Sequence, residues 1–294
     1  MSTLTFDHTV TGYGLPHARC LAEASDLAYK DPDTVRQRAG EWGFDRVQVF
    51  SVPFAPPFPL ADTQAYVAAS DQMVIVAFRG TEATQIRDWL SDGGALLTPY
   101  TGSKGLVHLG FHQALAEVWP QLHQSIDTLR DRDQSLWFTG HSLGGALAML
   151  AAARLHFEEP SQLPDGVYTF GQPRTCDHLL AAAYDKALQG RVFRFVNNHD
   201  IVAQLPPEPL YAHVAAERYI DADGHIHDTR PTTGGPLGNA TKTFTNGLGG
   251  LGGGLASAAG NTPAQLTDLL TSGTQGVRDH GIGNYIAALQ ANCP

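Results

Sequence analysis

The feature that most constrains the fold is a serine set between glycines, at the junction of an apolar run and a helix-forming run. Residues Leu136–Thr139 read as a buried strand, and Gly145–Ala153, rich in alanine and leucine, is a strong helix former. Between them, Gly140–Gly144 reads G-H-S-L-G. A turn this tight leaves no room for Cβ atoms beside Ser142, which accounts for the glycines. We therefore expect a sharp strand-to-helix turn that presents the Ser142 hydroxyl.

A serine on such a turn is the nucleophile elbow of α/β-hydrolases, and the helix N-terminus behind it favours developing negative charge. The alternative is a glycine-rich turn in which the serine only caps the helix. A second turn disfavours that alternative, because the apolar run Met73–Phe78 reads as a strand covered on both faces and ends in Arg79-Gly80-Thr81. An oxyanion hole needs one N–H after the nucleophile and one from a separate loop, which makes Leu143 and Thr81 the candidates.

A serine hydroxyl needs a histidine base that is oriented by a carboxylate, and in α/β-hydrolases the chain order is serine, acid, histidine. Asp200 fits the acid, because it closely follows the apolar run Val192–Val196 and so falls at the carboxyl end of a predicted strand. We expect the other nearby aspartates to be solvated on loops or helix surfaces: Asp165, Asp177 and Asp185. The residues alone leave four histidines after Asp200 as candidates for the base: His213, His225, His227 and His280.

Several motifs together resemble the class 3 lipases, the fungal-type triacylglycerol lipase family. The resemblance extends from about Val74 to Ile220, with a further match near His280. The matching stretches are F-R-G-T at Phe78–Thr81, V-H-L-G-F at Val107–Phe111, G-H-S-L-G-G-A at Gly140–Ala146, T-F-G-Q-P-R at Thr169–Arg174 and N-N-H-D-I-V at Asn197–Val202.

The resemblance implies a Ser142–Asp200–His280 triad, since His280 precedes an apolar C-terminal helix as the family's catalytic histidine does. His213 corresponds to a structural histidine of the family. We expect His141 and His199 to line the pocket, and His108 and His112 to pack or to make local hydrogen bonds. The spacing between Asp200 and His280 is longer than the family's, which the glycine-rich stretch between them explains.

The segment Glu82–Asp92 has Ile86, Trp89 and Leu90 on one helical face. Taken alone, this pattern favours an ordinary amphipathic surface helix. The resemblance implies instead a lid, with Trp89 as the lid tryptophan and Asp92 as the residue that hydrogen-bonds the oxyanion threonine. A lid covers the site in water and turns its apolar face onto a lipid surface.

The alternation of predicted strands and helices indicates an α/β fold with a mainly parallel central sheet and helices on both faces. With the resemblance, we expect one α/β-hydrolase domain over residues 1–294, with a helical lid region at 83–100 and a glycine-rich insertion at 234–262. The insertion is either a flexible surface excursion or a mobile apolar flap over the site.

Composition excludes several classes of partner. The net charge of −10 disfavours nucleic acid and anionic membranes, and no apolar run is long enough to cross a bilayer. The start of the chain has no signal-peptide pattern, which leaves a cytoplasmic protein or the mature form of a secreted one. Three widely spaced cysteines indicate reduced thiols, with a bridge between Cys20 and Cys293 as the alternative.

We expect no metal and no organic cofactor. His225 and His227 lie near Asp221, Asp223 and Asp228, but an Asp-Gly turn with exposed histidines explains this cluster as well as a metal site does.

The expected activity is that of a serine carboxylic-ester hydrolase, a lipase acting on triacylglycerols and other fatty-acid esters. The substrate is a lipid or a small ester, with a lipid–water interface as the place of action. The alternatives are a phospholipase A1, a short-chain esterase or a feruloyl-type esterase. A non-catalytic hydrolase-fold binding protein is a remoter alternative, because such proteins usually lack a member of the triad.

Overall fold

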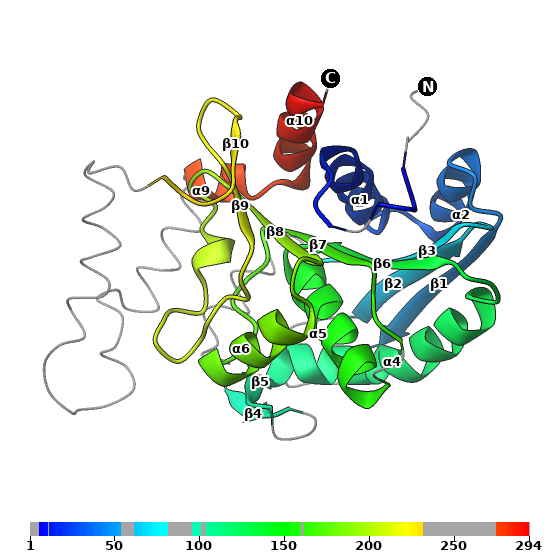
Figure 1. Ribbon diagram of the computed structural model, residues 1–294, viewed down its shortest axis with the longest axis horizontal. Helices are drawn as coiled ribbons and strands as arrows, with labels where there is room; N and C mark the ends of the chain where they lie inside the picture. Colours follow the sequence, from blue (N-terminus) through cyan, green and yellow to red (C-terminus); the bar gives the residue numbers. More distant parts are fainter. Residues whose placement is uncertain are drawn as a thin grey trace, which may run out of the picture.

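An eight-stranded sheet organises the chain in the computed structural model, which describes residues 6–10, 12–53, 62–81, 96–100, 104–159, 162–231 and 275–293 (Figure 1). The strand order is β1-β2-β3-β6-β7-β8-β9-β10. The five central strands, β3 to β9 in this order, pair in parallel, and the outer strands pair antiparallel. The sheet strands are β1 (Arg46–Pro53), β2 (Asp62–Ala69), β3 (Met73–Phe78), β6 (Ser135–His141), β7 (Gly166–Phe170), β8 (Val192–Asn197), β9 (Glu217–Ile220) and β10 (Ile226–His227).

Helices cover both faces of the sheet, as expected for buried parallel strands (Figure 1). One face carries α1 (Leu15–Leu27), α2 (Pro32–Glu41) and α10 (Ile282–Asn292), and the other carries α4 (Leu109–Leu129), α5 (Leu143–Glu158) and α6 (His178–Ala187). Alternate residues of β3 and β6 enter the two separate apolar clusters, and β3, β7 and β8 are buried along their whole length. The continuous apolar runs of the sequence therefore mark these central strands.

Side-chain caps set where several helices begin. The carboxylate of Asp31 accepts hydrogen bonds from the backbone of Asp33 and Thr34 at the start of α2. An unexpected cap is the ring of His108, whose Nδ1 accepts from Gly110 N at 3.1 Å at the start of α4. Burial lowers the pKa of His108 to about 4, so the ring is neutral and Nδ1 keeps the lone pair that a cap needs.

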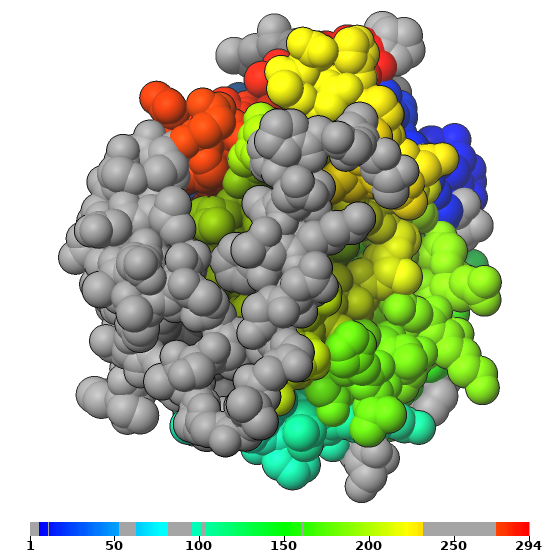
Figure 2. All heavy atoms as spheres, turned by 90° about the vertical axis from the view of Figure 1, so that its left-hand side faces the viewer, coloured from blue at the N-terminus to red at the C-terminus, as the bar shows by residue number. Residues whose placement is uncertain are grey.

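The edge of the sheet at β10 gathers segments from distant parts of the sequence. Figure 2 looks onto this edge, with the β9–β10 hairpin (yellow) at the top beside α9 (Gln275–Asp279, orange), and the pair β4 (Leu97–Pro99) and β5 (Leu106–His108) at the bottom (teal). Asn292 of α10 donates to the carbonyl oxygen of Gly224 in the hairpin turn at 2.7 Å. The C-terminal helix α10 is therefore tied to the β9–β10 hairpin at this edge.

Parts of the sequence prediction fall outside the described residues. Most of the predicted lid region 83–100, including Trp89 and Asp92, and the glycine-rich insertion at 234–262 are among them. The end of the predicted lid region, 83–100, forms the strand β4. Within the described residues no helix is long and apolar enough to span a membrane, and all three cysteines are free thiols.

The three aspartates expected to be solvated are partly exposed, and each also bonds a backbone N–H group. Asp177 caps α6 by accepting from Leu180 N at 2.8 Å. Asp165 accepts from Leu136 N at 2.8 Å, and Asp185 accepts from Ala215 N at 2.8 Å while burial raises its pKa. Backbone N–H groups at chain turns attract carboxylates, which the sequence alone does not reveal.

We predict that Ala216→Gly stabilises the protein. Ala216 has a φ of 58°, a left-handed conformation in which a Cβ is strained, and its carbonyl accepts from Arg194 N at the start of the β8–β9 pairing. Relief of this strain should raise the free energy of unfolding by about 0.5–1 kcal/mol, measured from the urea midpoint at constant slope. The matched control is Ala215→Gly, a neighbour outside the positive-φ set, which should be destabilising. An equal change in the free energy of unfolding for the two variants would contradict backbone strain at Ala216.

Candidate active site

The predicted nucleophile lies on a strained turn between β6 and α5. Ser142 has φ 58° and ψ −130°, a conformation rare for a residue with a side chain, and its N–H donates to the carbonyl of Phe170 at 2.9 Å. Although Ser142 stands at the N-cap position, its side chain makes no capping hydrogen bond. The hydroxyl is buried and has no partner within the described residues. This serine is therefore not held by a capping role.

Glycines make this turn possible through close backbone contacts. A Cβ on Gly140 would collide with the carbonyl group of Gly144, and a Cβ on Gly144 would collide with the carbonyl oxygen of Phe78 at the end of β3. Gly80, in the loop after β3, is equally confined, since its Cβ would lie 2.5 Å from the carbonyl oxygen of His141. The elbow and the loop that carries Thr81 are thus packed directly against each other.

The two predicted partners of the serine meet in the structure. The Nδ1 atom of His280 lies 3.0 and 2.9 Å from the two carboxylate oxygens of Asp200, and both side chains are buried. Asp200 also accepts from Val202 N at 2.9 Å and from the hydroxyl of Tyr285 at 2.5 Å. Three donors therefore converge on one carboxylate.

The charge state of Asp200 follows from these contacts. Burial alone raises the pKa of the carboxyl, but the nearby charge of His280 and the hydrogen bonds from His280 and Tyr285 outweigh burial and hold the pKa below its ordinary value. An ionised carboxylate only accepts hydrogen bonds, so Nδ1 of His280 carries the proton that faces it. In the neutral imidazole the other ring nitrogen, Nε2, then keeps its lone pair.

Two orphaned atoms mark the reactive side of the site. Nε2 of His280 and Oγ of Ser142 are both buried, and neither has a hydrogen-bond partner within the described residues. Buried polar atoms are nearly always paired, so two unpaired ones in a single site need an explanation. A base lone pair and a hydroxyl that become paired as a substrate binds would supply one.

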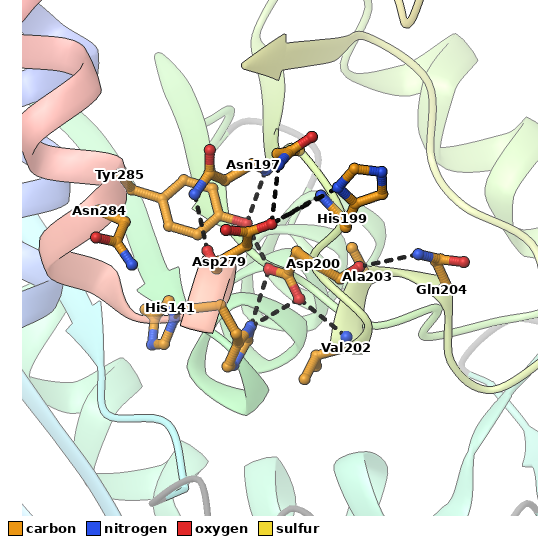
Figure 3. Close-up of polar contacts among 12 residues, drawn as sticks. His141, Asn197, His199, Asp200, Val202, Ala203, Gln204, Asp279, Asn284 and Tyr285 are labelled. Atoms are coloured by element: carbon orange, nitrogen blue, oxygen red, sulfur yellow. Dashed lines mark hydrogen bonds and ion pairs between the residues drawn. The ribbon is translucent and has the colours of Figure 1, made fainter. Parts of the chain in front are cut away.

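The loop that carries His280 is held by hydrogen bonds from the residues that precede Asp200. The side-chain amide of Asn197 donates to the carbonyl of Asp279 at 2.9 Å, and the Asp279 carboxylate accepts from Asn198 Nδ2 at 3.0 Å and from His199 N at 3.2 Å (Figure 3). His199 therefore contributes its backbone to the fixing of this loop.

Gly171, at the end of β7, packs against the buried pair. It has a φ of 60°, and a Cβ there would lie 2.7 Å from Asp200 Oδ2 and 2.9 Å from His280 Nδ1. Sequence reasoning did not single out Gly171, Tyr285 or Asp279. The available signal for Gly171 was a glycine directly after a predicted strand, at the edge where the other site residues lie.

The remaining candidates are placed as follows. Leu143 is the first residue of α5, and Thr81 is partly buried in the loop after β3. His141 precedes the serine, with its ring centroid 4.5 Å from that of His280. His213 is paired with the carbonyl of Ala203 at 2.5 Å, which agrees with a structural role.

The suggested metal cluster lies away from this site, in the β9–β10 turn. Ligand atoms of Asp221, Asp223 and His225 lie within 4.8 Å of one another. Asp221 accepts from the backbone of Asp223 and His225 and from His227 Nε2 at 2.7 Å, so these groups satisfy one another as in an Asp-Gly turn. His123, Asp127 and Glu159 form a second cluster of potential ligand atoms.

The sheet and the site together define the α/β-hydrolase fold. The serine follows β6 and the acid follows β8, both at the carboxyl ends of parallel strands, and the histidine that contacts the acid precedes the last helix. The sequence model of the class 3 lipases, "Lipase (class 3)", matches residues 75–210. The match supports the class 3 lipase family for this chain.

Relatives and solved structures agree with this assignment. The chain is 34% identical over 170 residues to a lipase of Rhizomucor miehei, covering 54% of this chain and 45% of that protein. It is 32% identical over 168 residues to a secreted mono- and diacylglycerol lipase of Malassezia restricta, covering 52% and 54%. The structure of the Rhizomucor miehei triacylglyceride lipase matches with a TM-score of 0.55 at 26% identity, over 71% of this chain and 81% of that one. The chain spans about half the length of the curated relatives it matches.

We predict that Tyr285→Phe lowers stability in a pH-dependent way. Its hydroxyl bonds the Asp200 carboxylate, so its loss should cost about 1–2 kcal/mol at pH 7. A carboxyl with a depressed folded pKa stabilises the protein above its unfolded pKa of about 3.9, and this stabilisation is lost as the pH falls through the folded value. The difference from wild type should therefore shrink below about pH 4.

Urea unfolding of both proteins from pH 7 to pH 3 measures this difference. Tyr100→Phe is the control, because the Tyr100 hydroxyl donates to a neutral acceptor, the carbonyl of Leu150, at 3.0 Å. Its cost should not depend on pH. A pH-independent cost for Tyr285→Phe as well would show that the tyrosine does not bond an ionised Asp200.

Proposed function

We propose that the protein is a serine carboxylic-ester hydrolase, a lipase that cleaves triacylglycerols and other fatty-acid esters through Ser142, Asp200 and His280. One observation carries this proposal. Nε2 of His280 and Oγ of Ser142 are buried without a partner in the described residues, while Asp200 holds the other nitrogen of the His280 ring. The names of the class 3 relatives, which include mono- and diacylglycerol lipases, support a lipid ester as the substrate.

In this mechanism the Ser142 hydroxyl attacks the ester carbonyl carbon while Nε2 of His280 takes its proton. Asp200 keeps the imidazole in the tautomer with the proton on Nδ1 and stabilises the imidazolium that forms. His280 then gives the proton to the leaving alcohol, and water releases the acid from the acyl-enzyme by the same steps. The side chains alone carry these proton transfers.

The negative charge of the tetrahedral intermediate develops at the N-terminus of α5. The N–H groups of Leu143 and Thr81, with the Thr81 hydroxyl, are the proposed donors to the oxyanion, and the close packing of Gly144 on the end of β3 keeps their two segments together. Removal of one such donor typically costs about 3 kcal/mol of transition-state stabilisation.

We predict that Ser142→Ala abolishes ester hydrolysis and leaves the fold intact. Loss of the nucleophile should lower kcat by at least about 10⁴-fold, because only binding and the oxyanion donors remain. Hydrolysis of p-nitrophenyl butyrate and the circular-dichroism melting curve are the measurements. Ser125→Ala, a buried serine on α4 that bonds Gln48, is the control and should keep its turnover. Substantial turnover by the purified Ser142→Ala protein would rule out Ser142 as the nucleophile.

The substrate class is tested by a hydrolysis series over p-nitrophenyl esters of increasing chain length, triacylglycerol emulsions and phosphatidylcholine. We predict the highest rates on emulsified long-chain triacylglycerols, with a rise in rate as the substrate passes its solubility limit, because a lid that covers the site in water would open on a lipid surface. A preference for phosphatidylcholine would indicate a phospholipase A1. A preference for dissolved short-chain esters, without the rise, would indicate an esterase.

A further inference from the structure

Tyr29, which lies just beyond the end of α1, reaches the elbow from a part of the chain that the motifs do not include. Its hydroxyl lies 2.8 Å from Nδ1 of His141, and the two ring centroids are 5.9 Å apart. The same hydroxyl occupies the place that a Cβ on Gly80 would need, in the loop that carries Thr81. Tyr29 therefore stands between the elbow and the proposed oxyanion loop.

His141 continues this contact to the predicted base. Its Nε2 lies 2.6 Å from the backbone carbonyl oxygen of His280. A carbonyl oxygen only accepts hydrogen bonds, so Nε2 of His141 carries a proton and donates it. The ring is fully enclosed, and burial together with the charge of His280 lowers the pKa of His141 to about 3. The ring is thus neutral, with its single proton on Nε2.

The protonation of one ring nitrogen determines the role of the other. In a neutral imidazole with the proton on Nε2, Nδ1 is an acceptor, so the Tyr29 hydroxyl donates to it. A hydrogen-bond chain then runs from the Tyr29 hydroxyl through the His141 ring to the main chain of His280. The opposite tautomer would place a lone pair against the carbonyl oxygen of His280 at 2.6 Å, which is repulsive.

We propose that Tyr29 is a positioning residue for the reaction: by donating to His141 it stabilises the tautomer and orientation that anchor the main chain of His280. This inference rests on the proposed function, because it concerns the imidazole that serves as the base. Asp200 holds that imidazole by its Nδ1 atom, and His141 holds the backbone from which it projects. Together they fix where Nε2 of His280 stands relative to Ser142.

The first test is Tyr29→Phe, compared with Tyr66→Phe. The Tyr66 hydroxyl donates to the carbonyl of Ala24 at 2.9 Å, so this control removes a hydroxyl that also anchors α1 but lies outside the site. With a dissolved p-nitrophenyl ester, Tyr29→Phe should lower kcat by about three- to tenfold, the equivalent of one neutral hydrogen bond, and leave KM within about twofold. Tyr66→Phe should lower only the melting temperature.

The second test asks whether Tyr29 acts through His141. In a His141→Gln background, the side-chain amide N–H can donate to the His280 carbonyl without any tautomer to select. Tyr29→Phe should then change kcat by less than about twofold, which gives a measurable coupling in the double-mutant cycle. An equal loss of kcat in both backgrounds would overturn the proposal, as would an effect of Tyr29→Phe on KM alone.

A spectroscopic readout needs no catalysis. Imidazole ¹⁵N shifts of His141 should report a single tautomer with the proton on Nε2 in the wild-type protein. The Nδ1 resonance should shift, or the tautomers should mix, in Tyr29→Phe but not in Tyr66→Phe. Identical His141 spectra in all three proteins would overturn the inference. A wild-type protein that hydrolyses no ester of the series would instead overturn the proposed function, so the two failures are distinguishable.

Discussion

The close approach of two backbones at the end of β6 is the constraint on which the rest of the structure depends. Gly144, in the first turn of α5, packs on the carbonyl of Phe78 at the end of β3, and Gly140 packs on Gly144. Because these contacts join backbone to backbone, any side chain at either glycine would push α5 away from the sheet. The same contact strains Ser142 into its positive φ and keeps the loop of Thr81 beside it.

Four neighbouring parallel strands end at this edge, and each carries one segment of the site: the loop of Thr81 after β3, Ser142 after β6, Gly171 after β7 and Asp200 after β8. The buried carboxylate of Asp200 would be costly alone, but it accepts from His280, Tyr285 and a backbone N–H. These donors offset its desolvation and leave it little freedom to move. The buried charge of Asp200 therefore requires fixed donors, and the same donors hold the carboxylate in one position.

Much of this arrangement could be predicted from local patterns. Local patterns predict the apolar runs that become β3, β7 and β8, the helix-forming run of α5 and the glycines around Ser142. Each of these features depends only on residues that are close together in the sequence. The pairing of Asp200 with His280 was expected only through chain order and family resemblance, since 80 residues separate them. The contacts of Tyr285 and Tyr29 had no local signal, because a tyrosine in a helical sequence reads as a core residue.

Local sequence was sufficient for the alternation of strands and helices, for the position of the strained elbow and for the chemical type of each site residue, because backbone sterics and burial periodicity act over a few residues. Only the folded chain decided which histidine meets Asp200, which tyrosines hold the carboxylate and His141, and that Gly171 must lack a side chain. Those choices depend on atoms brought within 3 Å from distant segments, and packing of the whole sheet, not local preference, sets such distances.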